Sequence, residues 1–207
     1  MKRLFLFFVV ILCCLSAYAS DIDHAEPYNP AFDKLGTAFQ FATMATGVVL
    51  MKEDFSEYPV IGTMYLETIG LTFVAKEALK HIVPRNRPYT YFDNAPVQEI
   101  ADWSRSFPSG HSAYAFAAAT FTSYVFCRYN PDSKAKLPVV LGSYALAAAT
   151  GIFRVESGNH FISDVLAGAL IGSAIGFAVP AVHHLIVASE NNQSRNSPFS
   201  FLIRISL

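Results

Sequence analysis

The sequence is poor in charged residues and in cysteine. Only 15% of its 207 residues are Asp, Glu, Lys or Arg, and the 15 basic and 16 acidic side chains leave a net charge of −1. Such a balance gives no broad attraction to nucleic-acid phosphates, so we expect no nucleic-acid partner. The three cysteines indicate no disulfide framework, because Cys13 and Cys14 are adjacent and Cys127 is left alone. We expect Cys127 to be an inert core thiol.

Metal-binding patterns are also missing. No spacing of Cys and His resembles a zinc site, and no cluster of carboxylates is able to hold magnesium. We interpret His24, His81, His183 and His184 as structural or surface residues. No stretch is typical of a linker, so one domain is expected, with no cofactor and no obligate protein partner.

What is present is apolar. The chain is 53% hydrophobic and 14% aromatic, which exceeds the hydrophobic content of a typical soluble domain. This composition predicts an all-α, antiparallel bundle of five to six mostly apolar helices embedded in a membrane. Three of the uncharged runs hold only 16 or 17 residues, at or just under the ~17–25 needed to span a bilayer. A soluble helical bundle therefore remains an alternative.

Residues 1–19 are expected to be a secretory signal peptide or a first membrane helix. Lys2 and Arg3 precede an apolar run that ends in Ala17-Tyr18-Ala19. In both interpretations the basic end stays in the cytoplasm and Asp21 emerges on the far side. The functional helical domain is predicted to span residues 20–188, and residues 189–207 form a tail to which we assign no function.

The hydrophobic pattern predicts five further helices and the connections between them. We expect residues 21–34 to be an exposed lead-in and residues 85–107 to be a long connecting loop. Pro84 and Pro88 should end the second of these helices by about Val83. The expected helices cover residues 35–51, 58–79, 112–127, 137–153 and 160–188.

The last of these helices carries Gly168, Gly172 and Gly176 at steps of four residues. Such a strip of small residues lets helices approach closely in a bilayer. It predicts tight packing against another helix.

Antiparallel helices bring several polar residues to one side of the bundle, the side expected to lie outside the cytoplasm. Three of these residues are cations without nearby acidic partners, which predicts a tetrahedral anion site of the kind that phosphate fills. The converging residues are Lys80, Arg87, Ser109, Gly110, His111, Arg154, His160 and Asp164.

The chemistry of this group is that of phosphate binding and transfer. Pro108 to Ser112 enters a helix, whose N-terminus favours anions. His160 and Asp164 are four residues apart on one helical face, so the carboxylate can accept from one ring nitrogen and leave the other free to attack. His111 lies across the pocket, where it can protonate a leaving oxygen.

These residues form three spaced motifs that resemble those of the type 2 phosphatidic acid phosphatase superfamily, which also contains bacterial acid phosphatases and vanadium haloperoxidases. One departure is Phe153, where the family usually has Ser before the third-motif Arg. The motifs here are Lys80-x6-Arg87-Pro88, Pro108-Ser109-Gly110-His111 and Arg154-x5-His160-x3-Asp164.

The resemblance implies a metal-independent phosphatase of a membrane lipid phosphate or pyrophosphate. His160 would be the nucleophile that forms a phosphohistidine, Asp164 would orient it, and His111 would protonate the leaving alcohol and later activate water. The phosphoryl oxygens would be held by Lys80, Arg87, Arg154, Ser109 and the Gly110 amide. The implied location is a bacterial inner membrane, with several spans and the site facing the periplasm or exterior.

Three other functions stay open at this point. The first is a soluble periplasmic acid phosphatase or phosphotransferase, released by signal cleavage. The second is a vanadium haloperoxidase, and the third is a membrane bundle that binds an anion without turnover. Arg85 and Arg105 lie near the motifs, and we interpret them as structural.

Overall fold

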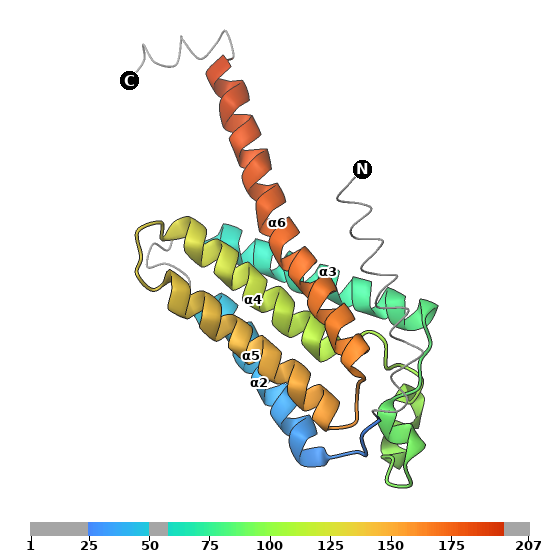
Figure 1. The fold of residues 1–207 in the computed structure, drawn as a ribbon. Coiled ribbons are helices and arrows are strands. Elements are labelled where there is room, and N and C mark those ends of the chain that lie inside the picture. The colour runs from blue at the N-terminus through green and yellow to red at the C-terminus, as the bar shows by residue number, and fades with distance from the viewer. Residues whose placement is uncertain (1–24, 50–57, 197–207) are drawn as a thin grey trace.

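The computed structural model describes residues 25–49 and 58–196, which fold into long helices joined end to end (Figure 1). Over these ranges the only β-type pairing is an isolated bridge between Arg85 and Arg105. The expected all-α bundle is confirmed, while the predicted signal peptide or first helix at 1–19 lies outside the described residues. The helices are α2 (Pro30–Val49), α3 (Tyr58–Ile82), α4 (Gly110–Tyr129), α5 (Lys136–Glu156) and α6 (Ile162–Asn196), with two short 3-10 helices, η4 (Pro88–Tyr91) and η5 (Val97–Asp102), between α3 and α4.

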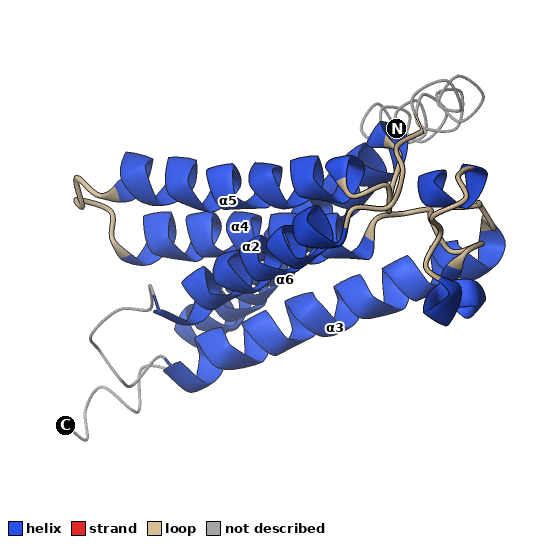
Figure 2. Ribbon diagram, turned by 90° about the horizontal axis from the view of Figure 1, so that it is seen from below, coloured by secondary structure: helices blue, strands red, loops and turns tan. Residues whose placement is uncertain are grey.

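Helix α4 is the centre of the bundle. It packs against α2, α3, α5 and α6, whereas α5 and α6 barely touch each other. Figure 2 shows α2, α4 and α5 side by side, with α3 along another side of the bundle. Small side chains permit this central position, since a run of alanines on α4 is fully buried. These are Ala113, Ala115, Ala117, Ala118 and Ala119.

The predicted close packing of the glycine strip is confirmed against α4. A Cβ atom on Gly172 would lie 2.1 Å from the carbonyl oxygen of Ala113, and one on Gly176 would lie 2.3 Å from that of Ala117. On Gly168 it would lie 2.4 Å from the carbonyl oxygen of Ser109. The strip therefore fixes the distance between the backbones of α4 and α6, beginning at the first turn of α4.

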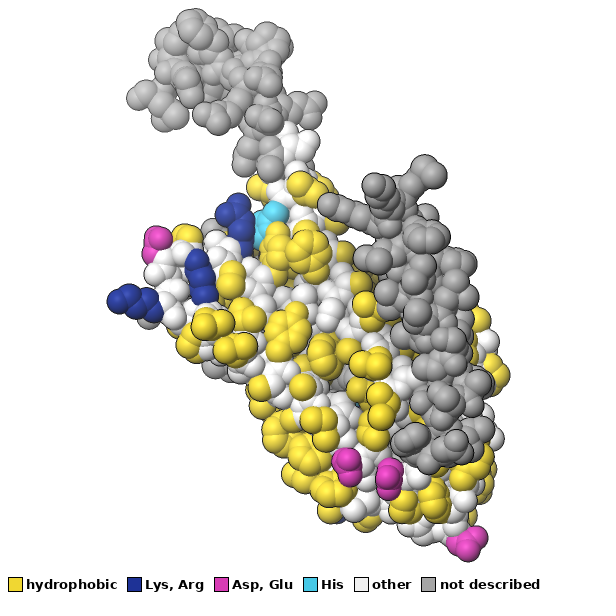
Figure 3. Space-filling view, viewed as in Figure 1, with side chains coloured by type: hydrophobic (Ala, Val, Ile, Leu, Met, Phe, Trp, Pro, Cys, Tyr) yellow, Lys and Arg dark blue, Asp and Glu magenta, His cyan; other side chains and the backbone are white. Residues whose placement is uncertain are grey.

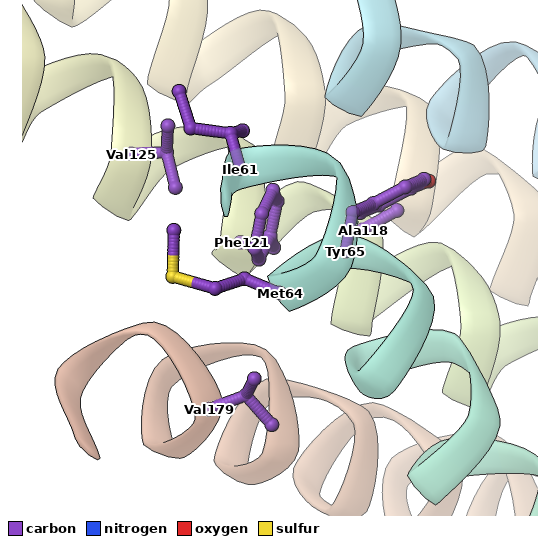
Figure 4. Close-up of a cluster of buried hydrophobic side chains, with 7 residues drawn as sticks. All are labelled: Ile61, Met64, Tyr65, Ala118, Phe121, Val125 and Val179. Atoms are coloured by element: carbon purple, nitrogen blue, oxygen red, sulfur yellow. The ribbon is translucent and has the colours of Figure 1, made fainter. Parts of the chain in front are cut away.

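A hydrophobic cluster joins α3, α4 and α6 on the half of the bundle far from the α3–α4 connection (Figure 4). The ring centroids of Tyr65 and Phe121 are 5.0 Å apart, and the Tyr65 hydroxyl donates a 2.6 Å hydrogen bond to the carbonyl of Met44 in α2. These contacts hold the helices in register over their length. The full cluster is Ile61, Met64, Tyr65, Ala118, Phe121, Val125 and Val179.

The outer surface of the bundle is apolar. Large hydrophobic side chains such as Leu66 (73% exposed) and Leu185 lie on the surface, and hydrophobic atoms dominate the face in Figure 3. In the described part of the chain, α5 and residues 162–187 of α6 are long and apolar enough to cross a membrane. This surface suits a lipid environment better than water.

The main difference from the predicted helices is at the start of α2. Residues 30–34, predicted as part of an exposed lead-in, are helical. Pro30 begins the helix, where its missing N–H costs nothing, and the Asn29 side chain accepts a 3.0 Å hydrogen bond from the amide of Ala31. At the other end of the chain, α6 continues to Asn196, beyond the predicted end near 188. The earlier start of α2 places Asp33 within its first turn.

Candidate active site

The candidate site lies at the end of the bundle where α3 and α5 end and α2, α4 and α6 begin. The connection between α3 and α4, with η4 and η5, covers this end (Figure 1). A pocket of about 370 Å³ opens here. Five of the eight predicted site residues line it, namely Lys80, Arg87, Gly110, His111 and His160.

Arg87 is held from two sides. Its Nε donates a 3.0 Å hydrogen bond to the carbonyl of Asp102, and Nη2 lies 3.4 Å from the Asp102 carboxylate. Its Nη1 donates to the side-chain oxygen of Asn159, at 3.1 Å. The guanidinium is therefore fixed before any anion binds.

Lys80 is the last buried residue of α3. Its Nζ donates to the carbonyl of Arg105, in the strand-like segment that leads to α4. One of three donors is engaged by this bond, so the ammonium group keeps others for an anion in the pocket.

Arg154 does not stand apart from acidic residues, as the sequence suggested. It is 3% exposed, at the end of α5, and forms an ion pair with Asp33 of α2. The same Asp33 oxygen accepts a 3.2 Å hydrogen bond from Asn159. The expectation of three cations without acidic partners was therefore wrong, because Asp33 and Asp102 lie beside Arg154 and Arg87. Asp102 itself lines the pocket, whereas Asp33 does not, and each carboxylate orients the guanidinium group that it contacts.

Ser109 caps α4 and ties it to α6. Its Oγ accepts a 3.4 Å hydrogen bond from the Ser112 amide, and its own amide donates to the carbonyl of Asp164, at 3.0 Å. Gly110 follows as the first residue of α4, and a Cβ atom there would lie 3.1 Å from Cδ of Lys76. The free N–H groups of this helix start therefore face a basic pocket.

His160 lies in the turn before α6, with Asp164 behind it. Nδ1 of His160 is 3.8 Å from Oδ2 of Asp164 and has no hydrogen-bond partner. Burial, followed by the positive charges of Arg87 and Arg154, lowers the pKa of His160 well below its usual value of 6.5. The imidazole is consequently neutral at physiological pH, the state in which a ring nitrogen can attack.

His111 is half-buried in the first turn of α4, across the pocket from α6. Its Nε2 lies 3.2 Å from Oγ1 of Thr37, and that hydroxyl donates its single proton to the carbonyl of Asp33. Thr37 must then accept from His111, so Nε2 carries the proton of the neutral ring.

Several residues around the site were not found from the sequence. Asp33, Thr37 and Asn159 orient the arginines and His111, while Arg85 and Ser106 bind Asp164. A signal existed for α2, because Asn29-Pro30 is typical of a helix start and would have put Asp33 and Thr37 on one helical face. No local pattern marked the others.

Comparison with known proteins finds similarity over most of the helical bundle. A model of the PAP2 superfamily matches residues 61–187. Phosphatidylglycerophosphatase B of Bacillus subtilis is 34% identical over 57% of this chain and 56% of its own length. Lipid A 4'-phosphatase of Helicobacter pylori is 32% identical over 74% of this chain and 72% of its own length.

The fold also matches a solved structure. The crystal structure of a transmembrane PAP2-type phosphatidylglycerolphosphate phosphatase from Bacillus subtilis has a TM-score of 0.64 and 25% identity, covering 89% of this chain and 96% of that one. The chain spans about half the length of the first curated relatives it matches. With its apolar surface and these neighbours, the helical bundle is a membrane protein. The family match covers more than half of the chain, which thus belongs to the PAP2 superfamily.

Proposed function

We propose that this protein is a phosphatase that hydrolyses a membrane lipid phosphate or pyrophosphate through a phosphohistidine on His160. One observation carries the proposal. The neutral, buried imidazole of His160 shares a single pocket with Lys80, Arg87 and His111, and α2 forms one wall of that pocket.

The contacts of the two histidines assign their roles. Because Nδ1 of His160 faces Asp164, Nε2 is the atom that attacks phosphorus. His111 enters this step as the imidazolium, because the negative charge of the bound phosphate favours the charged form of the ring. The bond to the lipid oxygen breaks as that oxygen takes the proton from His111, which becomes neutral. Water then attacks the phosphohistidine, His111 takes a proton from that water, and the P–N bond breaks to release phosphate. The 3.8 Å separation from Asp164 closes on substrate binding, as catalytic contacts commonly do.

Charge on the phosphoryl oxygens is stabilised by the chain's own cations. Lys80, Arg87 and Arg154 supply positive charge, and Ser109 and the Gly110 amide supply donors at the start of α4. Among residues 25–49 and 58–196, no group of three His, Cys, Asp or Glu side chains is placed to hold a metal ion. We therefore propose that hydrolysis proceeds without an added metal.

The shape of the pocket favours a lipid substrate. Thr37, Gln40 and Phe41 of α2 form one wall. Phe41 is 61% exposed and lies eleven residues after Pro30, which puts it about 16 Å along the helix. The pocket therefore opens beside an exposed aromatic side chain, which suits a head group that is attached to a lipid. The names of the Bacillus and Helicobacter relatives point to lipid-linked phosphates as well.

The distribution of basic residues supports an extracytoplasmic site. The connection between α4 and α5 lies at the end of the bundle opposite the pocket, and in or beside it are Arg128, Lys134 and Lys136. Lys and Arg side chains are visible at that end in Figure 3. Basic loops stay in the cytoplasm, so the pocket faces the periplasm when the protein is in a bacterial inner membrane.

Cysteine labelling tests this orientation. In a variant with the native cysteines replaced by serine, Asp93→Cys, near the pocket, should react with an impermeant maleimide in intact spheroplasts, while Lys134→Cys should react only after lysis. The reverse pattern would overturn the orientation. Both positions are exposed.

Phosphate release from a panel of lipids tests the activity. Purified protein in detergent, with EDTA, should release phosphate from at least one of phosphatidic acid, phosphatidylglycerol phosphate, a lipid A phosphate or undecaprenyl pyrophosphate. His160→Ala should abolish release, while His81→Ala, an exposed histidine on α3, should not. No release by the wild type, or full activity of His160→Ala, would overturn the proposal.

A further inference from the structure

Arg85 binds the carboxylate of Asp164 directly. Its Nη1 donates hydrogen bonds of 2.7 Å to Oδ1 of Asp164 and 2.7 Å to Oγ of Ser163. Arg85 is 5% exposed and Asp164 is 0% exposed. The pair therefore lies out of contact with water, and Arg85, which we interpreted from the sequence as structural, binds a predicted site residue.

The backbone delivers a second donor to the same carboxylate. The amide of Arg85 bonds to the carbonyl of Ser104 at 3.0 Å, and the amide of Ser106 bonds to the carbonyl of Arg85 at 2.9 Å. This bridge between the segments after α3 and before α4 places the Ser106 hydroxyl 2.6 Å from Oδ2 of Asp164.

A third donor comes from the turn that carries His160. The Phe161 amide lies 2.9 Å from Oδ2 of Asp164, and the Phe161 ring covers the Arg85 guanidinium at 4.0 Å. Arg85 thus holds Oδ1, while Ser106 and Phe161 hold Oδ2. Nδ1 of His160, which is 3.8 Å from Oδ2 and has no hydrogen-bond partner, faces this fixed carboxylate.

Each of the three buried arginines at the site has its own acidic partner. A buried carboxylate is costly without a counterion, and Arg85 supplies one for Asp164. Arg87 and Arg154 have Asp102 and Asp33 as their own acidic partners. The phosphate-binding arginines are therefore not drawn toward Asp164, and Asp164 remains an anion that can accept from His160.

We propose that Arg85 is a positioning residue for catalysis. It holds Asp164 ionised and in the one orientation that keeps the proton of His160 on Nδ1, which leaves Nε2 free to attack. The role of His160 as nucleophile rests on the proposed function, whereas the effect of Arg85 on its tautomer does not.

A double-mutant cycle separates this role from simple support of the fold. Arg85→Met, Arg85→Lys, Asp164→Asn and the double variant Arg85→Met/Asp164→Asn are compared on the best lipid phosphate of the panel. Arg85→Met should lower kcat about 10- to 100-fold, the range for losing the outer partner of a functional histidine. KM should stay within about twofold, since Lys80, Arg87 and Arg154 are untouched.

The double variant distinguishes a positioning role of Arg85 from simple support of the fold. In the Asp164→Asn background, Arg85→Met should cause no further fall in kcat, because Arg85 acts through Asp164. Arg85→Lys keeps the charge without the fork to Ser163 and should retain more activity than Arg85→Met. Additive losses of kcat, or a raised KM with unchanged kcat, would overturn the proposal.

A second readout needs no turnover and guards against a folding defect. Nitrogen-15 spectra of histidine-labelled protein report the tautomer of His160, and the signals of His160 are identified by their absence in the variant His160→Asn. The wild type should show Nδ1–H, and both Arg85→Met and Arg85→Lys should show a lower Nδ1–H population, with unshifted signals from His81. An unchanged His160 tautomer overturns the proposal even if the protein hydrolyses nothing; a changed tautomer in an inactive protein supports it while the proposed function fails.

Discussion

The carboxylate of Asp33, in the first turn of α2, is ion-paired with the guanidinium of Arg154 at the end of α5, 121 residues later in the chain. Through Asn159, the same carboxylate is linked to Arg87. Two of the three cations assigned to phosphate binding are thus held by one acidic residue. That residue lies outside the segment that matches the family model.

Replacing this carboxylate should weaken substrate binding. We expect Asp33→Asn to raise KM for the lipid phosphate about tenfold, because Arg154 loses the partner that orients it and a buried guanidinium is left undercompensated. Steady-state kinetics check this, with Asp93→Asn, an exposed acidic residue at the same end, as the control. An unchanged KM in Asp33→Asn would contradict the role assigned to the pair.

Removing the proton donor should trap the intermediate. With p-nitrophenyl phosphate, whose leaving group needs little protonation, His111→Asn should still form the phosphoenzyme but hydrolyse it slowly, because no base activates water. Rapid-quench experiments should show a burst of nitrophenol followed by a turnover at least ~100-fold slower than that of the wild type. A slow first turnover without a burst would contradict this prediction, because formation of the phosphoenzyme would then be the slowed step.

The buried His160 should make stability depend on pH. The folded state keeps His160 neutral because its pKa is lowered, whereas the unfolded chain takes up a proton near pH 6.5. The unfolded state binds more protons below that pH, so the free energy of unfolding falls as the pH falls, by up to about 1.4 kcal/mol per pH unit from this group.

Thermal unfolding in detergent at pH 7.5, 6.0 and 5.0 measures this effect. Relative to the wild type, His160→Asn should become progressively more stable as the pH is lowered, while His81→Asn should track the wild type. If the unfolding midpoints of His160→Asn and the wild type differ by the same amount at all three pH values, the predicted pH dependence is contradicted.

The contact between α4 and α6 should tolerate no added methyl group. Gly172→Ala places a Cβ 2.1 Å from the Ala113 carbonyl, which forces the helices apart and should cost roughly 1–3 kcal/mol. Gly70→Ala is the matched control, because a Cβ on this exposed helical glycine meets nothing within 4 Å. The unfolding midpoint should fall for Gly172→Ala and stay level or rise for Gly70→Ala; equal midpoints would contradict the packing account.

The sequence predicted those parts of the molecule that depend on local pattern. Apolar runs and prolines placed α3, α4 and α5 to within a few residues, and antiparallel order was enough to bring Lys80, Arg87, Gly110, His111 and His160 to one pocket. The start of α2 was missed because residues 21–34 are polar, although Asn29-Pro30 marks a helix start.

The partners of the site residues could not be predicted in this way. Arg85 meets Asp164 across 79 residues, and Asp33 meets Arg154 across 121. Ion pairs of this kind depend on how helices and loops rotate against one another, which no short-range spacing specifies. Arg85 and Arg87 look alike in sequence, yet Arg85 binds the buried carboxylate of Asp164 whereas Arg87 lines the pocket.

The central claim is that His160 carries the phosphoryl group during turnover. To test it, the protein is mixed with a lipid phosphate that carries ³²P in its phosphate group, and the reaction is stopped rapidly without acid. The labelled peptide is then mapped. We predict an acid-labile, base-stable label on the peptide that contains His160, absent in His160→Asn. Label on another residue, or full turnover by His160→Asn, would contradict the account.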